Sequence, residues 1–263
     1  MSAARALVAA ALLLACGAPA PAAAEGPAVC ARDADWGLVA CLETPTGRYG
    51  HNVLGAFGEW AELTLRFEPG LGSGTGKGTQ ALENARLALP EDRVFEDVAP
   101  RLADIVPGGR PEIVVVESSR AAGAALAVYG FRGGRLERLA AAEPIGRPFR
   151  WLAPAGIADL DGDGVLEIAY VETPHIGGRL RVMGLRDGAL AEIASAPGFS
   201  NHRIGEDFIT GGVRDCGAGP ELVLPDFRWS ETRVVRLEAG ALVAETLAGN
   251  AEAATLAGAL ACR

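Results

Sequence analysis

The chain repeats itself at an interval of about 54 residues, and this repeat limits the possible folds more than any other feature. Residues 103–117 align with residues 158–172 without a gap, at an offset of 55. A third copy, residues 220–226, follows at an interval of 54. Each copy is followed by short apolar runs that Gly-containing turns separate. A period in this range with several short strands per unit predicts a radial or stacked repeat architecture.

All of the elements expected within these units are strands. In the best-defined unit the predicted strands are residues 151–158, 167–172, 179–185 and 190–195. The unit before it begins with a predicted strand at residues 95–103. Four strands per unit are typical of a propeller blade. We therefore expect an all-β fold, specifically a β-propeller of four or five four-stranded blades, because the repeats cover residues 49–247 and the terminal segments could complete a further blade.

The loop between the first two strands of this unit carries four carboxylates in nine residues. Residues 159–167 read Asp-Leu-Asp-Gly-Asp-Gly-Val-Leu-Glu. Like charges this close repel one another unless a cation lies among them. Acids at alternate positions, with glycines between them, let the backbone curl and direct several oxygens to one point, which suits Ca²⁺. Tyr170 stands where an EF-hand needs Glu, and the flanks are β-rich, so we expect a calcium loop on a sheet.

In this loop and the apolar strand after it, the chain resembles the FG-GAP/VCBS repeat family, whose blades build integrin-alpha-like β-propellers. The family's pattern, Asp-x-Asp-x-Asp-Gly-x-x-Asp, is matched here up to Gly164, with Glu in place of the last Asp. The resemblance implies a Ca²⁺ site whose ligands are the side chains of Asp159, Asp161, Asp163 and Glu167 and the backbone carbonyl of Val165. The alternative is a solvated acidic turn that holds no metal.

The other two copies of the loop lack most of these acids. The second copy has Val106 and Gly108 at the middle acidic positions, so we expect it to be metal-free or very weak. The third copy, aligned without a gap, has Val213 at the first position. Only the loop at residues 159–167 is therefore expected to bind calcium.

The N-terminal segment predicts export. Arg5 precedes an uncharged run, residues 6–24, with a leucine-rich centre and an Ala-Ala-Ala end before Glu25. Such a stretch is typical of a cleaved secretory signal and too short to span a bilayer comfortably. We predict a signal peptide at residues 1–24, one mature domain at residues 25–263, no transmembrane segment, and a periplasmic or secreted location. A lipid anchor at Cys16 is the alternative, because residues 13–16 resemble a bacterial lipobox.

The cysteines outside the signal support this location. Cys30, Cys41, Cys216 and Cys262 are even in number, which suits two disulfides in an oxidising compartment. Three connectivities are possible. A Cys30–Cys41 bond would close a small N-terminal loop, and a Cys216–Cys262 bond would tie the last residues to the last repeat.

The net charge disfavours two classes of partner. The net charge of −9 disfavours nucleic acid and anionic lipid surfaces, which select basic patches.

The Gly-rich insertion at residues 69–80 departs from the Walker pattern at Leu71 and Gly78, and no predicted helix follows it. We interpret the insertion as a flexible connection between strands.

His51, His202, Asp207 and Trp229 are the remaining candidates for ligand binding. Both histidines lie at or near the start of a repeat, and equivalent positions in a propeller gather on one face or around the axis, so His51 and His202 could meet with Asp207 nearby. Alternatively, each caps a strand or bonds to a neighbouring blade. Trp229 lies between predicted strands and could bind a peptide or carbohydrate, with core packing as its alternative.

Two classes of function are compatible with these features. The first is an exported, calcium-stabilised β-propeller that acts as a non-catalytic binding or scaffold module for a protein or glycan partner. The second is an exported hydrolase or lyase with its site at the axial mouth of the propeller. Neither a Gly-x-Ser-x-Gly nor a His-Glu-x-x-His motif is present. We prefer the first, which needs no chemistry that the sequence lacks.

Overall fold

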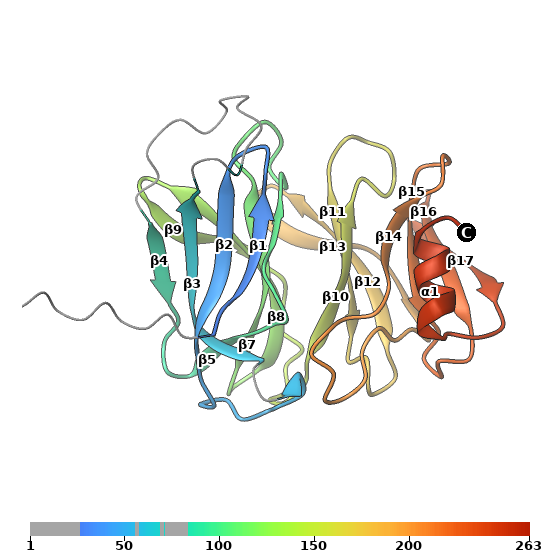
Figure 1. Cartoon of the computed structure of the whole chain (residues 1–263), viewed down its shortest axis with the longest axis horizontal. Helices are drawn as coiled ribbons and strands as arrows, with labels where there is room; N and C mark the ends of the chain where they lie inside the picture. Colours follow the sequence, from blue (N-terminus) through green and yellow to red (C-terminus); the bar gives the residue numbers. More distant parts are fainter. Residues whose placement is uncertain (1–26, 56–57, 69–70, 72–83) are drawn as a thin grey trace, which may run out of the picture.

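The computed structural model describes residues 27–55, 58–68, 71 and 84–263, which form antiparallel β-sheets and one short helix (Figure 1). The predicted all-β class is confirmed. The predicted signal peptide at residues 1–24 with Cys16, and all but Leu71 of the Gly-rich insertion at residues 69–80, lie outside the described residues. The one described helix is too short to cross a membrane.

The first half of the described chain forms a nine-stranded sheet. Its main path is β1-β2-β3-β5-β7-β8-β9, with β4 paired to β3 and β6 paired to β7. These strands are β1 (Val29–Asp33), β2 (Leu38–Pro45), β3 (Glu59–Phe67), β4 (Ala85–Ala88), β5 (Arg93–Glu96), β6 (Arg101–Ala103), β7 (Glu112–Ser119), β8 (Gly123–Arg132) and β9 (Arg135–Ala141).

The second half forms two four-stranded sheets and the helix. In both sheets the strands lie in sequence order, so each is a simple antiparallel meander. One sheet contains β10 (Leu152–Ala158), β11 (Glu167–Glu172), β12 (Arg179–Arg186) and β13 (Ala189–Pro197). The other contains β14 (Gly212–Asp215), β15 (Pro220–Pro225), β16 (Thr232–Glu238) and β17 (Ala241–Ala248), and α1 (Ala253–Leu260) follows it.

The sheets pack face to face as four layers (Figure 1). The nine-stranded sheet supplies the first layer, β1–β4, and the second layer, β6–β9, which β5 joins by pairing with both β3 and β7. The third layer is β10–β13, and the fourth is β14–β17. A separate apolar core lies between each neighbouring pair, and a further one lies between the fourth layer and α1.

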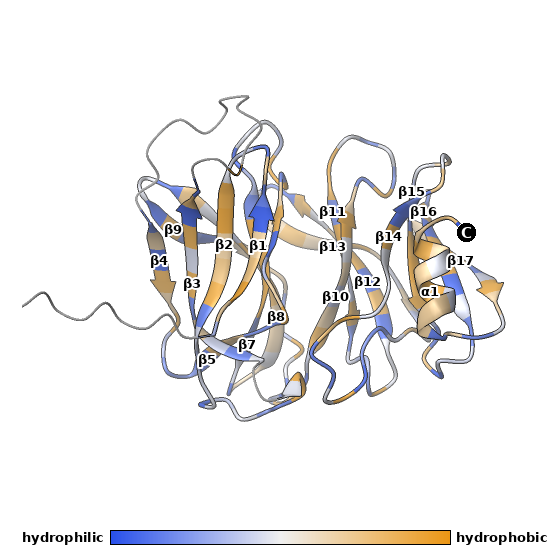
Figure 2. Cartoon of the chain, in the orientation of Figure 1, coloured by the Kyte–Doolittle hydropathy of each residue, from blue (hydrophilic) through white to orange (hydrophobic). Residues whose placement is uncertain are grey.

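The second strand of each inner layer is buried on both faces. In β7, Ile113 and Val115 enter the core toward the first layer, whereas Val114 and Val116 enter the core toward the third. Strands β11 and β15 divide their side chains in the same way. Side chains alternate along a strand, so a strand between two cores needs an unbroken apolar run, as in the repeated segments of the sequence. Figure 2 shows apolar residues along the strands inside the stack.

The part of the chain that the structure describes does not form the expected closed propeller, and it differs from the sequence prediction in three further respects. The described residues form no closed ring or barrel, and their sheets have nine, four and four strands. Strands β1 and β2, which were expected to lie outside the repeats, belong to the first layer. The strand expected at residues 95–103 is divided into β5 and β6, because Asp97 accepts hydrogen bonds from the backbone of Val98 and Val116 at 2.8 and 3.0 Å. Helix α1 was not predicted.

Both disulfides named as possibilities are present. The Cys30–Cys41 bond joins β1 to β2, where the two residues are register partners. The Cys216–Cys262 bond fastens the chain after α1 to the turn between β14 and β15. Two such bonds fit an oxidising compartment.

Candidate functional site

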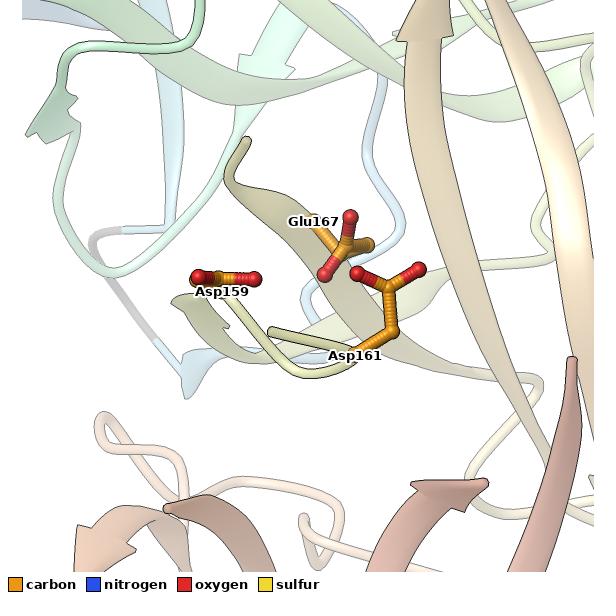
Figure 3. A group of neighbouring side chains, drawn as sticks. All are labelled: Asp159, Asp161 and Glu167. Atoms are coloured by element: carbon orange, nitrogen blue, oxygen red, sulfur yellow. The ribbon is translucent and has the colours of Figure 1, made fainter. Parts of the chain in front are cut away.

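The acidic loop joins β10 to β11 in the third layer. Register pairing of Ala158 with Glu167 brings its two ends together. One carboxylate oxygen from each of Asp159, Asp161 and Glu167 lies within 4.8 Å of the others. Figure 3 shows the carboxylates of Asp161 and Glu167 directed toward each other, with Asp159 on the opposite side of the loop. Three acids of this one loop therefore share one small volume.

The loop backbone curls around its own carboxylates. Asp159 accepts hydrogen bonds from the N–H groups of Gly162 and Gly164, at 2.8 and 3.0 Å. Both glycines have φ above 75°, a conformation that other residues rarely adopt, so the Gly positions of the motif are required by this turn. Asp163 accepts the N–H of Val165 at 2.8 Å. Asp163 and the carbonyl of Val165 are not part of the three-acid group and remain predicted ligands.

Glu167 is the unusual member of this group because it is buried. Its side chain is 1 % exposed, and it accepts the backbone N–H of Leu160 at 2.8 Å. No arginine within the described ranges forms an ion pair with it. Burial raises the pKa of Glu167, the Leu160 N–H opposes this, and the charges of Asp161, Asp163 and Asp159 raise it further. A buried carboxylate that lacks a cation is costly, and an oxygen-preferring cation among these acids would remove the cost.

The corresponding glutamates of the neighbouring layers have arginine partners. Glu112 at the start of β7 is paired with Arg132 at 2.7 Å. Glu221 in β15 is paired with Arg214 at 2.7 Å and with Arg236 at 2.9 Å. Burial raises the pKa of Glu221, but the hydrogen bonds from the two arginines outweigh it and leave that pKa below its usual value. In the second and fourth layers, a protein cation therefore neutralises the acid.

The structure corrects the gapless alignment of the third copy. Strand register places Arg214 opposite Glu221, as Ala158 lies opposite Glu167. The turn between β14 and β15 is thus shorter than the acidic loop by two residues, and Asp215 rather than Val213 occupies the position of Asp159. Asp215 also accepts hydrogen bonds from two loop glycines, at 2.7 and 3.2 Å. An ungapped comparison could not detect this shortening.

No hydrogen bond joins His51 to His202. A third histidine, His175, which the sequence did not single out, lies near both of them. His175 bonds to His202 at 2.9 Å and lines the same pocket as His51. His202 is 1 % exposed and its other ring nitrogen bonds to the carbonyl of Glu206 at 2.9 Å. His202 is thus held by hydrogen bonds to the loop after β11 and to the backbone four residues further along the chain.

His51 has an acidic partner that the sequence did not indicate. Its Nδ1 lies 2.6 Å from the carboxylate of Glu96, which is 1 % exposed and also accepts the hydroxyl of Ser118. Burial raises the pKa of Glu96, and the bond to His51 opposes this. The two residues are 45 positions apart, so only the packing of the loop before β3 against β5 reveals the pair.

Asp207 and Trp229 lie at separate places. Asp207 is exposed and lines two surface hollows, of about 370 and 480 Å³. Trp229 is half-buried, packs against the core between the fourth layer and α1, and has the guanidinium of Arg203 at 3.9 Å from its ring centroid. These contacts favour the packing interpretation of Trp229.

A scan against models of known protein families found no match to this chain, and a search of curated proteins found none either. The resemblance to FG-GAP/VCBS repeats therefore rests on the residues of the repeat and the loop, and it stays a prediction.

Proposed function

We propose that this protein is an exported, non-catalytic binding or scaffold module that one Ca²⁺ ion stabilises. The ion would be held at the loop between β10 and β11 by Asp159, Asp161, Asp163, Glu167 and the carbonyl of Val165. The observation that carries this proposal is the buried Glu167, which has no cationic partner among the residues that the structure describes, where its counterparts in two other layers have arginine.

Calcium has a structural role in this proposal. Bound among the acids, it offsets their mutual repulsion and pins the loop over the end of the third layer. Extracellular modules bind Ca²⁺ with Kd on the order of 10⁻⁴–10⁻³ M, and calcium outside the cytosol is abundant enough for such a site. The two disulfides support the exported location.

We propose further that the four layers are propeller blades of the FG-GAP/VCBS kind, arranged as an open row. Support comes from the four-stranded meanders of the third and fourth layers and from the face-to-face cores between layers. A rigid stack of this kind presents its loops at fixed positions to a protein or glycan partner.

An exported hydrolase or lyase is the second candidate, and the His51–Glu96 pair is the observation that favours it. A carboxylate that holds one nitrogen of an imidazole is a common arrangement for a general base. The non-catalytic proposal remains preferred because the only hydroxyl that bonds to Glu96 in the described part of the chain, that of Ser118, is buried.

Thermal unfolding with calcium and with a chelator tests the calcium proposal. Because only the folded state has the site, calcium at ten times its Kd should stabilise the protein by about 1.4 kcal/mol, or roughly 3–6 °C for a chain of this size. The double variant Asp161→Ala, Asp163→Ala should lose this difference. A charge-matched control, Glu143→Ala with Glu252→Ala, changes two exposed acids elsewhere and should keep it. A wild-type melting curve that chelation leaves unchanged would contradict the proposal.

A further inference from the structure

A pocket of about 340 Å³ lies where four loops meet, next to the core between the second and third layers. The loops precede β3, precede β10, follow β11 and follow β13. Its lining includes His51, Phe149, Arg150, His175, Ile176 and Ile204. This volume is at the lower end of the range for small-molecule sites, about 300–1,000 Å³.

The rim of this pocket is apolar and exposed. Phe149, Ile176 and Ile204 are 47 %, 57 % and 72 % exposed, and they are three of the seven large hydrophobic residues exposed on the described part of the chain. Clustering of exposed apolar side chains around a hollow marks a binding site more than scattered ones do. The rim therefore favours an apolar ring over a sugar, which would need many polar contacts.

The walls are held rigidly by contacts behind them. The ring of His175 lies parallel to that of Trp151, at 11° and 6.3 Å between centroids, and His202 contacts both, with a hydrogen bond to His175 and its ring edge-on to Trp151. Burial, together with the nearby charges of His202 and His51, lowers the pKa of His175 to about 4, so this wall is neutral at pH 7. Phe149 and Thr173 have φ of 54° and 48°, in the left-handed region that bulky residues rarely adopt. Such strain is concentrated at functional sites.

The polar groups of the pocket are basic or neutral. The chain has 33 acids and a net charge of −9, yet none of the described residues that line this pocket is an acid. Arg150 supplies the permanent charge. His51 is oriented by Glu96 through Nδ1, and no residue within the described ranges bonds to its Nε2. The lining thus offers one permanent cation to one anionic substituent.

We propose that this pocket binds a small aromatic carboxylate. The ring packs against Phe149, Ile176 and Ile204, and the carboxylate is held by the guanidinium of Arg150. The volume limits the ligand to a small molecule, the apolar rim favours a ring, and Arg150 favours an anionic group. The inference goes beyond the proposed function and does not depend on the calcium site.

The probe for this proposal is phenylacetate, compared with its neutral analogue phenylacetamide and with the non-aromatic cyclohexylacetate. Titration followed by tryptophan fluorescence and by saturation-transfer NMR gives the three affinities. We expect saturable binding of phenylacetate, with each analogue bound at least tenfold more weakly. Equal binding of phenylacetamide would contradict the proposed need for a carboxylate, and equal binding of cyclohexylacetate would contradict the need for an aromatic ring. If phenylacetate binding does not saturate in the millimolar range, the pocket is not a site for this ligand.

Two variants locate the binding. Ile204→Glu places a like charge on the exposed rim and should weaken phenylacetate binding at least tenfold, whereas Val243→Glu, on the exposed edge of β17, should change it less than twofold. Arg150→Gln should reduce the preference for phenylacetate over phenylacetamide at least threefold. The same effect from both glutamate variants, or an unchanged preference in Arg150→Gln, would overturn the proposal. Phenylacetate should still bind in chelator below the melting temperature, so failure of the calcium proposal and failure of this one are distinguishable.

Discussion

Three glutamates at the same position in successive layers show how one residue type can be neutralised in different ways. Glu112 and Glu221 are paired with arginines, and Glu167 lies against two aspartates. The acids of the loop are neighbours in sequence, so their convergence could be predicted. The arginine partners come from other strands of the same layer, so the contrast that makes Glu167 informative is visible only in the fold.

Replacing each of two glutamates with glutamine should have opposite effects when calcium is absent. In chelator, Glu167→Gln removes a buried charge that has no cation and keeps an acceptor for the Leu160 N–H, so it should be more stable than the wild type. Glu221→Gln leaves Arg214 and Arg236 without their acid and should lose about 1–3 kcal/mol. Urea unfolding at pH 7 measures both differences.

The same two variants separate a metal site from an ordinary buried acid. Added calcium should stabilise Glu221→Gln as much as the wild type, whereas Glu167→Gln should no longer respond. A loss of stability in Glu167→Gln in chelator, of the same size as in Glu221→Gln, would mean that another group already neutralises Glu167.

The pocket residues illustrate the limit of sequence reasoning at this scale. His51 was singled out from its place near a repeat start, but Glu96 and His175 were not, because no local pattern links them to it. Their proximity follows from loops that different layers contribute. A single sequence without a fold gives no means of pairing such loops.

At the scale of elements, strands between two cores were the most predictable. Strand β11 has the predicted bounds, since an apolar run between turns has few other interpretations. Strands β1 and β2 were missed as part of the first layer because they precede the repeat. The division of β5 from β6 depends on hydrogen bonds to the side chain of Asp97. Strand propensities of single residues give no information about such bonds.

Helix α1 was missed because it lies outside the repeat, and its role depends on a neighbour in space. Its Leu256 and Ala259 are buried against Val223 and Val234 of the fourth layer. Helix-forming residues such as Ala and Leu were a local signal for it. The helix covers a sheet face that would otherwise be exposed and apolar.

Leu256→Ala should therefore destabilise the protein by about 2–4 kcal/mol, the usual cost of truncating a buried leucine. Ala254→Ser, on the exposed side of the same helix, should cost about 0.5 kcal/mol or less. Urea unfolding measures both. Equal stability of the two variants would show that the helix does not cap the stack.

At the scale of the whole molecule, the two ends of the row are closed by different means. The outer face of the first layer carries paired polar groups, including the Thr64–Glu43 hydrogen bond at 3.0 Å and the Arg86–Glu62 ion pair. The fourth layer is closed by α1 and by the Cys216–Cys262 bond. Stacked repeats need such terminal caps to remain soluble. The repeat period predicted stacked units, but a period alone does not reveal whether the stack closes into a ring.

Calcium titration of the purified mature chain by isothermal calorimetry tests the central claim most directly. The account predicts one site per chain with Kd on the order of 10⁻⁴–10⁻³ M, and no saturable binding in the Asp161→Ala, Asp163→Ala variant. Absence of saturable heat in the wild type, or the same binding isotherm in both proteins, would contradict it.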